Sequence, residues 1–334
     1  MNNINMKEWS AQTMADRRVA ALPIMTHPAI EWLGHTVREA VCDGRIQARA
    51  VMATAQRYPV AAATTIMDLT VEAEAFGARV DMSGPGVPAV VGRLLTDADD
   101  IGALAVPSLD KGRVPQYVKA CLIAARSIAD RPLLAGCIGP FSLAGRLFGM
   151  SEMMVLLCED APAAHRLLDK CTAFITKYCM ALRTAGANGV VMAEPAAGLL
   201  SADDCRRFSS EYVRRVVEKV QDDGFMLVLH NCGNTGHCTR AMVETGAAAY
   251  HFGNKCRMGE VIKDVPANAL VMGNLDPVSV FKDGTAEHVR KATRQLLDEM
   301  RGFPNFVISS GCDIPPNTPL ENIDAFFEET TFKS

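Results

Sequence analysis

A histidine and a cysteine two positions apart carry the sharpest chemical signal in the sequence. His230 and Cys232 lie at the end of an apolar run, within Leu229–Asn234. On a β-strand, residues i and i+2 point to the same side, so both side chains can face one metal ion. Cys312 follows another apolar run, and a barrel of parallel strands would bring the two strand ends together. Three such donors leave a fourth position open, which is typical of a catalytic rather than a structural zinc site.

Other interpretations of these residues stay open. A His-x-Cys pair can equally be a hydrogen-bonded histidine beside a core cysteine, and Cys312 can be a small buried hydrophobic residue. His237 and Cys238 could also complete a local site with the first pair. However, Gly233–Thr235 is typical of a turn and a helix cap, which favours placing His237 and Cys238 at the start of the next helix.

Further polar side chains occur where other apolar runs end. Glu194, before a proline, could be a fourth metal ligand, a base or one half of a salt bridge, and Asp68 could line the same pocket. These two are the candidate catalytic residues. His251 also lies on an expected strand, where a hydrogen-bonded core histidine is the favoured interpretation. The remaining candidates, for binding a cofactor or lining the pocket, are His27, Asn274 and Asp276.

The donor set indicates what the metal would do. Two thiolates and a neutral imidazole bring a charge of about −2 to a divalent ion, which weakens its Lewis acidity. Such a site suits a substrate thiol that loses its proton on binding and stays nucleophilic. Sulfur ligands also favour zinc over magnesium or calcium. The residues therefore predict alkyl transfer to a zinc-bound thiolate, and a zinc hydrolase with water in the fourth position is the alternative.

The elements that would position these residues alternate along the chain. Short runs rich in Val, Ile, Leu and Ala are followed by stretches with helical spacing, such as Ala161–Ala185. The runs are Ala21–His27, Val60–Leu69, Pro132–Pro140, Gly189–Pro195, Phe225–Gly233, Ala247–Gly253, Ala269–Pro277 and Phe306–Ile314. Continuous apolar runs are typical of parallel strands buried on both faces. We therefore predict an α/β fold, a single (β/α)8 TIM barrel over residues 21–334, with an open doubly wound sheet as the alternative. Residues 1–20 are expected to form an N-terminal helical extension over the barrel floor.

Composition narrows the functional classes. Of 334 residues, 49% are hydrophobic and 22% are charged, which excludes disorder, collagen and coiled coil. A net charge of −4 with no basic run is evidence against nucleic-acid binding. The sequence starts without the apolar segment of a signal peptide, and no apolar run approaches the ~18 residues of a membrane span, so we expect a cytoplasmic protein without a membrane partner. The 11 cysteines, an odd number without regular spacing, are then expected to be thiols.

Several motifs resemble a known family over about residues 15–330. They are Leu229–Asn234, Gly273–Pro277, Gly311–Ile323, Ile138–Gly145 and Asp68–Gly77. Together they are similar to the uroporphyrinogen decarboxylase superfamily. The His-x-Cys pair combined with the late Gly-Cys-Asp is more similar to its zinc-dependent branch, the methylcobamide:coenzyme M methyltransferases.

The resemblance implies a TIM barrel that binds zinc through His230, Cys232 and Cys312. It implies transfer of a methyl group from a methylcobamide to a thiol such as coenzyme M or a related acceptor. The chain has no Asp-x-His-x-x-Gly motif that would ligate a corrinoid. The resemblance therefore implies that the corrinoid co-substrate arrives on a partner, a separate corrinoid protein. The oligomeric state is left open.

The decarboxylase branch is the alternative within the family. It needs no metal, and it is expected to have an Arg-rich N-terminal segment and a histidine where Cys312 stands. This chain has Asp16–Val19 at its start, without that signature. A tetrapyrrole- or corrinoid-binding protein that has lost catalysis is a further, non-enzymatic interpretation.

Overall fold

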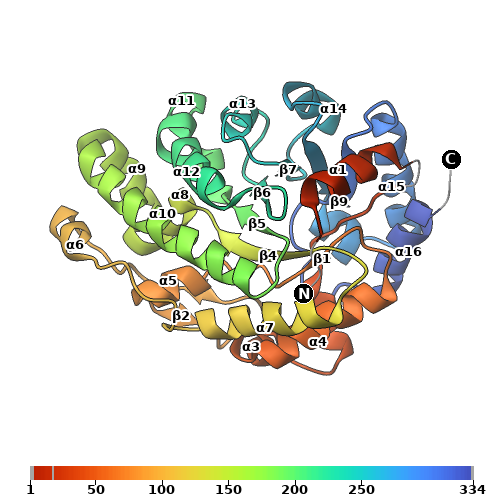
Figure 1. Cartoon of the computed structure of the whole chain (residues 1–334), viewed down its shortest axis with the longest axis horizontal. Helices are drawn as coiled ribbons and strands as arrows, with labels where there is room; N and C mark the ends of the chain where they lie inside the picture. Colours follow the sequence, from red (N-terminus) through yellow and green to blue (C-terminus); the bar gives the residue numbers. More distant parts are fainter. Residues whose placement is uncertain (1–3, 17–18, 332–334) are drawn as a thin grey trace.

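Seven parallel strands form the central sheet of the computed structural model, which describes residues 4–16 and 19–331 (Figure 1). The strands pair in the order β1-β4-β5-β6-β7-β8-β9. Each strand of this sheet therefore lies beside the strand of the same sheet that follows it in the sequence, and β2 and β3 belong to a separate hairpin. The bounds of the seven strands are β1 (Ala63–Thr64), β4 (Leu133–Ile138), β5 (Gly189–Ala193), β6 (Met226–Asn231), β7 (Ala249–Phe252), β8 (Leu270–Leu275) and β9 (Phe306–Ser310). All seven lie within runs predicted from the sequence, which confirms the α/β class and the parallel sheet.

The first predicted strand, Ala21–His27, does not form. Ala21 makes a single parallel bridge to Ile308, and α2 (Thr26–Trp32) begins inside the predicted run. Pro23 has no N–H to donate to a ladder, which limits this segment to isolated bonds. Main-chain bonds still reach both edges of the sheet, because Leu22 N donates to Ile308 O and Ala61 N donates to Ala21 O. The prediction of eight regular strands is therefore wrong by one, and the closed (β/α)8 barrel stays a prediction.

Helices surround the curved sheet (Figure 1). The longest, α10 (Ala161–Thr184), begins at the N-cap Asp160 and buries apolar residues at helical spacing, as its sequence predicted. The others after α2 are α3 (Val37–Cys42), α4 (Gly44–Arg57), α5 (Val71–Phe76), α6 (Ala98–Ala103), α7 (Val114–Ser127), α8 (Pro140–Phe148), α9 (Met150–Glu159), α11 (Ala202–Cys205), α12 (Glu211–Val220), α13 (Thr239–Val243), α14 (Met258–Val261), α15 (Ala286–Met300) and α16 (Leu320–Thr331). Short 3-10 or π-helical turns are η1 (Pro195–Leu199), η2 (Arg206–Ser210), η3 (Ile262–Asp264) and η4 (Pro277–Lys282). A separate hairpin pairs β2 (Val80–Asp81) with β3 (Ala89–Val90).

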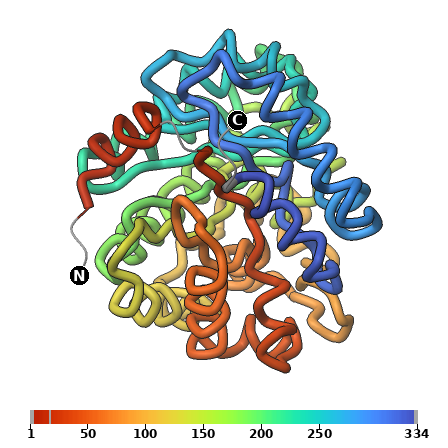
Figure 2. Tube along the Cα trace, turned by 90° about the vertical axis from the view of Figure 1, so that its right-hand side faces the viewer, coloured from red at the N-terminus to blue at the C-terminus, as the bar shows by residue number. Residues whose placement is uncertain are grey.

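A leading helix, α1 (Met6–Ala15), lies across the N-terminal ends of the strands. The Asn5 side chain caps it, and Met6 N donates to Asp223 O in the turn before β6. Figure 2 shows α1 in red at one side of the molecule, beside that part of the chain. The Met6 side chain is buried against the inner face of the sheet. The helix expected within residues 1–20 is therefore present, and the division of the chain into an extension and a barrel stays a prediction.

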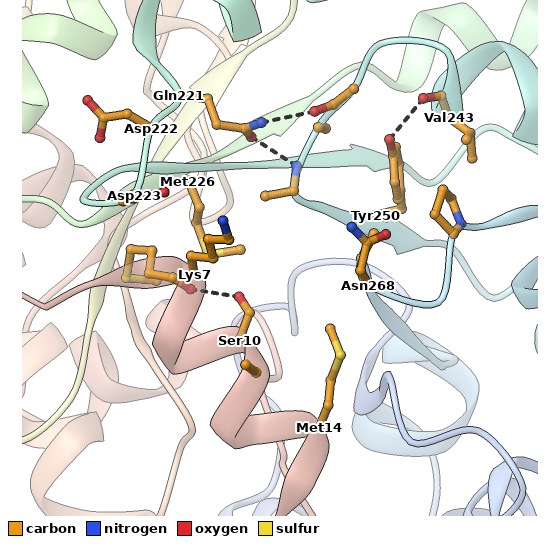
Figure 3. Close-up of a pocket in the computed structure, with 17 residues that line it drawn as sticks. Lys7, Ser10, Met14, Gln221, Asp222, Asp223, Met226, Val243, Tyr250 and Asn268 are labelled. Atoms are coloured by element: carbon orange, nitrogen blue, oxygen red, sulfur yellow. Dashed lines mark hydrogen bonds between the residues drawn. The ribbon is translucent and has the colours of Figure 1, made fainter.

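Between α1 and the start of β6–β8 lies a cavity of about 590 Å³ (Figure 3). Two of its polar side chains already bond to backbone carbonyls that line the cavity. The Gln221 amide donates to Gly246 O, and the Tyr250 hydroxyl donates to Val243 O. The cavity lies at the end of the sheet opposite to the predicted ligands, and it has no part in the site described below.

Over the described ranges, no single helix combines the length and the apolar composition of a membrane span. Helices α8 and α9 have the length and the apolar composition of a span only when they are counted as one segment. Their axes are bent by 104° relative to each other.

Met6 supplies a test of how α1 is attached. We expect Met6→Ala to lower the free energy of unfolding by about 2–5 kcal/mol, because it leaves a cavity in a packed cluster. Denaturant unfolding followed by circular dichroism measures this change. Gln12→Ala, on the exposed side of the same helix, is the control and should stay within about 0.5 kcal/mol of the parent. Equal unfolding midpoints for the two variants would show that α1 does not depend on this contact.

Candidate metal centre

The alternation of side chains along the strands delivers the site residues to one end of the sheet. Met226 and Val228 of β6 belong to the cluster on its inner face, and His230 is the next residue in that row. Ala249 holds the same row in β7, where it is followed by His251. His230 and His251 are direct partners in the parallel ladder. The inner row therefore changes from apolar to polar at the carboxyl ends of the strands.

Three potential metal ligands converge at this end. His230 ends β6, Cys232 follows it, and Cys312 comes two residues after β9. Their ligand atoms lie within 4.8 Å of one another, and Cys312 Sγ is 3.7 Å from His230 Nε2. In a tetrahedral zinc site, Zn–S and Zn–N bonds of about 2.3 and 2.0 Å place the ligand atoms about 3.5–3.8 Å apart. The distance between Cys312 Sγ and His230 Nε2 is within about 0.2 Å of this spacing, and the whole group lies within 4.8 Å, so the donors can converge on one zinc ion.

The three side chains differ in their exposure to solvent. His230 is only 2% exposed, whereas both cysteines are half-buried. A hydrogen bond from Cys312 lowers the pKa of the Cys232 thiol to about 7 against the effect of burial, and Lys255 adds to the shift. The same pairing raises the pKa of Cys312. One thiolate is therefore available near neutral pH, before any metal binds.

Two glycines allow the loops of the site to pass close together. A Cβ on Gly253 would lie 2.6 Å from Cys232 Cα, and one on Gly311 would lie 2.5 Å from Asn254 N. Asn274, predicted to bind a cofactor, holds this loop in place, because its amide donates to Gly253 O (2.9 Å) and Cys256 O (2.7 Å). Its side chain is therefore already engaged in shaping the wall beside Cys232.

His251 is the residue that the sequence interpretation undervalued. Its Nδ1 lies 2.8 Å from His230 Nδ1, and its Nε2 lies 2.8 Å from Ser309 Oγ. Burial, with the charge of His230 added, lowers its pKa well below the ordinary histidine value. It is a satisfied buried histidine, as predicted, but it contacts a candidate ligand directly. The register of neighbouring strands could have revealed this contact, whereas Ser309 gave no chemical signal.

His27 and Asp276 lie in the structure around the candidate ligands. His27, at the start of α2, is buried with Nδ1 2.8 Å from Asp313 Oδ2, next to Cys312. Burial lowers its pKa, but the carboxylate of Asp313 outweighs that effect and the net shift is upward. Asp276 caps η4 and accepts a bond from Asn254 Nδ2 at 2.6 Å. Neither residue belongs to the group of three metal donors.

The two predicted catalytic carboxylates are held by other groups. Asp68 accepts bonds from the Arg113 guanidinium, the Tyr117 hydroxyl and Thr70, all buried. Glu194 accepts bonds from Phe141 N (2.7 Å) and Ser142 N (2.8 Å) at the start of α8. A carboxylate at a helix N-terminus satisfies free N–H groups and the helix dipole. Both residues are engaged structurally, and neither joins the three-donor group.

The alternative local site does not assemble. His237 Nε2 bonds to Leu200 O at 3.0 Å, and the Cys238 thiol contacts the carbonyls of Ala197 and Leu200. Both side chains therefore turn toward η1. His230, Cys232 and Cys312 form the one group of three or more possible metal ligands in residues 4–16 and 19–331.

Comparison with known proteins places the chain in a family. Residues 17–331 match the family model for uroporphyrinogen decarboxylase (URO-D). The chain belongs to the uroporphyrinogen decarboxylase family of enzymes, as its motifs indicated.

Within that family the sequence is similar to methyltransferases. The methylcobamide:CoM methyltransferase MtbA of Methanosarcina mazei is 30% identical over 266 residues, or 78% of this chain and 76% of that protein. A uroporphyrinogen decarboxylase of Solibacter usitatus is 25% identical over 277 residues, which cover 80% of this chain and 78% of that protein. A solved structure of a methyltransferase from Methanosarcina mazei shares the fold, with a TM-score of 0.87 over 99% of this chain and 98% of that one at 23% identity.

Glu72, in α5, is a buried carboxyl whose hydrogen-bonding capacity is only partly used. Oε1 accepts a bond from Ile138 N at 2.9 Å, whereas Oε2 has no hydrogen-bond partner among the described residues. Burial raises the pKa of Glu72 to about 7. The unfolded chain ionises this carboxyl near pH 4.5, so folding is penalised as the pH rises from about 4.5 to 7.

We expect Glu72→Gln to remove this penalty. Relative to the parent, the variant should gain up to about 3 kcal/mol of stability between pH 5 and pH 8. Denaturant unfolding at both pH values measures the gain. Glu8→Gln, an exposed substitution, is the control and should follow the parent at both pH values. Parallel stability profiles for Glu72→Gln and the parent would show that the carboxyl is ionised in the folded protein.

Proposed function

We propose that this protein transfers a methyl group from a methylated corrinoid, carried on a separate corrinoid protein, to a small thiol. In this proposal, His230, Cys232 and Cys312 hold a zinc ion. The convergence of these three donors, from segments 80 residues apart, is the observation that carries the proposal. The similarity to a methylcobamide:CoM methyltransferase supports the corrinoid and suggests coenzyme M or a related thiol as the acceptor.

The donor set is suited to this chemistry. Two thiolates and a neutral imidazole offset the charge of a divalent zinc, and sulfur ligands select zinc over hard ions. When bound, the ion supplies an open position for the substrate thiol and lowers the pKa of that thiol. The nearby carboxylates of Asp68 and Glu194 are bound to other groups, so they leave the donor set sulfur-rich.

The protein's own contribution is positioning. The two cysteines are only half-buried, so a substrate sulfur is proposed to approach from their side, whereas His230 is buried. In the reaction a sulfur–carbon bond forms and the cobalt–carbon bond breaks. Both electrons of the broken bond stay on cobalt, which goes from Co(III) to Co(I), and the thiol proton goes to solvent. The protein holds the sulfur, carbon and cobalt atoms in line. The bimolecular reaction then becomes effectively unimolecular.

Five other residues keep the roles predicted from the sequence as proposals. Asp68 and Glu194 are proposed to act in catalysis, and His27, Asn274 and Asp276 in holding a cofactor or substrate. Their hydrogen bonds within the protein support at least a role in shaping the site.

Removing one donor tests the metal site. We expect the purified protein to hold about one zinc ion per chain, and His230→Ala and Cys312→Ala to lose most of it. Cys238→Ala is the matched control, because that thiol lies outside the three-donor group, and it should keep its zinc. Elemental analysis after dialysis measures the content. Unchanged zinc in both donor variants would rule out the proposed ligands.

A second measurement tests the reaction. Under anoxic conditions, wild-type protein should convert methylcobalamin and a thiol to Co(I) corrinoid and a thioether, followed by absorbance and mass spectrometry. Cys312→Ala should lower the rate of methyl transfer by more than about 100-fold. Losing a residue that only hydrogen-bonds to a metal ligand already costs roughly 10–100-fold in activity, and losing the ligand itself should cost more. Release of CO₂ from uroporphyrinogen, unaffected by Cys312→Ala and without methyl transfer, would assign the protein to the decarboxylases instead. Thiol-independent ester hydrolysis that is lost in Cys312→Ala would indicate the zinc hydrolase.

A further inference from the structure

A row of hydrogen bonds leads from the backbone of the N-terminal segment to the candidate ligand His230. The Ser309 hydroxyl bonds to Leu22 O at 2.7 Å and lies 2.8 Å from His251 Nε2. His251 Nδ1 in turn lies 2.8 Å from His230 Nδ1. The row ends at His230 Nε2, which is 3.7 Å from Cys312 Sγ. It crosses the inner face of the sheet from residue 22 to β9, β7 and β6.

The first member of this row determines the direction of every bond. A backbone carbonyl can only accept, so Ser309 uses its single proton on Leu22 O. The Ser309 oxygen must then accept from His251, which places the His251 proton on Nε2. A neutral His251 has a lone pair on Nδ1, so His230 donates from Nδ1–H. His230 is left with the lone pair on Nε2, the nitrogen that faces Cys312.

We propose that His251 and Ser309 are positioning residues that fix His230 in its Nδ1–H tautomer and so direct the Nε2 lone pair toward the two cysteines. The zinc ion in this inference rests on the proposed function. The tautomer itself does not, because it follows from contacts within the protein alone.

Burial makes the alternative tautomer costly. His230, His251 and Ser309 are 2%, 1% and 0% exposed, so water does not compete for their bonds. If His230 carried its proton on Nε2, two lone pairs would face each other between the Nδ1 atoms. A buried polar group without a partner costs about 1–3 kcal/mol. An N–H would also point at the position that a metal ion needs.

The fold maintains this geometry independently of any ligand. His230 and His251 are partners in the β6–β7 ladder, and their rings meet edge to face with centroids 4.5 Å apart. Ser309 belongs to the same inner row, two residues beyond the buried Val307. Metal-binding histidines commonly donate their second ring N–H to an acceptor that fixes the ring orientation, and here a second histidine is that acceptor.

Nitrogen NMR of the metal-free protein tests the tautomer directly. In protein labelled with ¹⁵N-histidine at pH 8, we expect the proton of His230 on Nδ1 and that of His251 on Nε2. His230→Ala and His251→Gln spectra assign the signals. Finding His230 as the Nε2–H tautomer would overturn the proposal, whether or not the protein binds zinc.

Zinc affinity tests the consequence for metal binding. We expect His251→Phe to bind zinc about 10–100-fold more weakly than wild type in competition with a chromophoric chelator. His251→Gln offers an amide oxygen to His230 and an amide N–H to Ser309, so it should recover most of the loss. Ser309→Ala removes only a hydroxyl, so it serves as the second variant if His251→Phe does not fold. It should also weaken zinc binding. Circular dichroism checks that each variant folds.

The outcomes separate this inference from the proposed function. Wild-type protein that binds zinc no more tightly than His230→Ala contradicts the proposed function, and the tautomer is then judged by NMR alone. Wild-type affinity in His251→Phe, together with zinc loss in His230→Ala, overturns the positioning role while leaving the metal site intact. Equal loss in His251→Phe and His251→Gln also overturns it, because the glutamine amide can restore the hydrogen bonds to His230 and Ser309 and phenylalanine cannot.

Discussion

The site depends on the way side chains alternate along buried strands. A parallel strand inside an α/β fold must place every second residue on the inner face, and the ladder aligns the rows of neighbouring strands. The inner rows begin with apolar residues, which are Met226 and Val228 in β6, Ala249 in β7 and Val307 in β9. The same rows end in His230, His251 and Ser309, so these polar groups are buried against one another. The strand register, together with the bond from Ser309 to Leu22 O, is therefore what we propose to orient the His230 ring.

A second feature, at the same end of the sheet, is that the carboxylate oxygens are bound by groups outside the three-donor group, whereas the two cysteine sulfurs belong to that group. The carboxylate of Glu194 closes the N-terminus of α8, and that of Asp68 is bound by Arg113 and Tyr117. Cys232 and Cys312, which supply the sulfur atoms, are only half-buried. Helix α8 and the buried Arg113 thus occupy carboxylate oxygens, the ligand type that magnesium and calcium prefer. Under the proposed function, these contacts contribute to the preference of the three-donor group for zinc.

Much of this arrangement could be predicted from local sequence. Seven of the eight apolar runs are strands because burial on both faces leaves a continuous apolar pattern. His230 and Cys232 could be placed on one side from their spacing alone, and Cys312 from the order of parallel strands. What could not be predicted depends on partners distant in sequence. Arg113 binds Asp68 from 45 residues away, and the helix start capped by Glu194 lies 53 residues before it. The composition of residues 21–27 predicts a strand. Pro23 and the early start of α2 instead limit the segment to one bridge, between Ala21 and Ile308.

The contact between Leu22 and Ser309 has a consequence for how the protein is made. Its two residues are 287 positions apart, and His230 and Cys312 are separated by 82. During synthesis, the segment around Leu22 leaves the ribosome before β9, and contacts of such long range form slowly. The proposed orientation of His230 is therefore established only after both Leu22 and Ser309 are in place. Under the proposed function, a growing chain carries His230 and Cys232 before Cys312, so the three-donor group is complete only once β9 and the residues that follow it have been made.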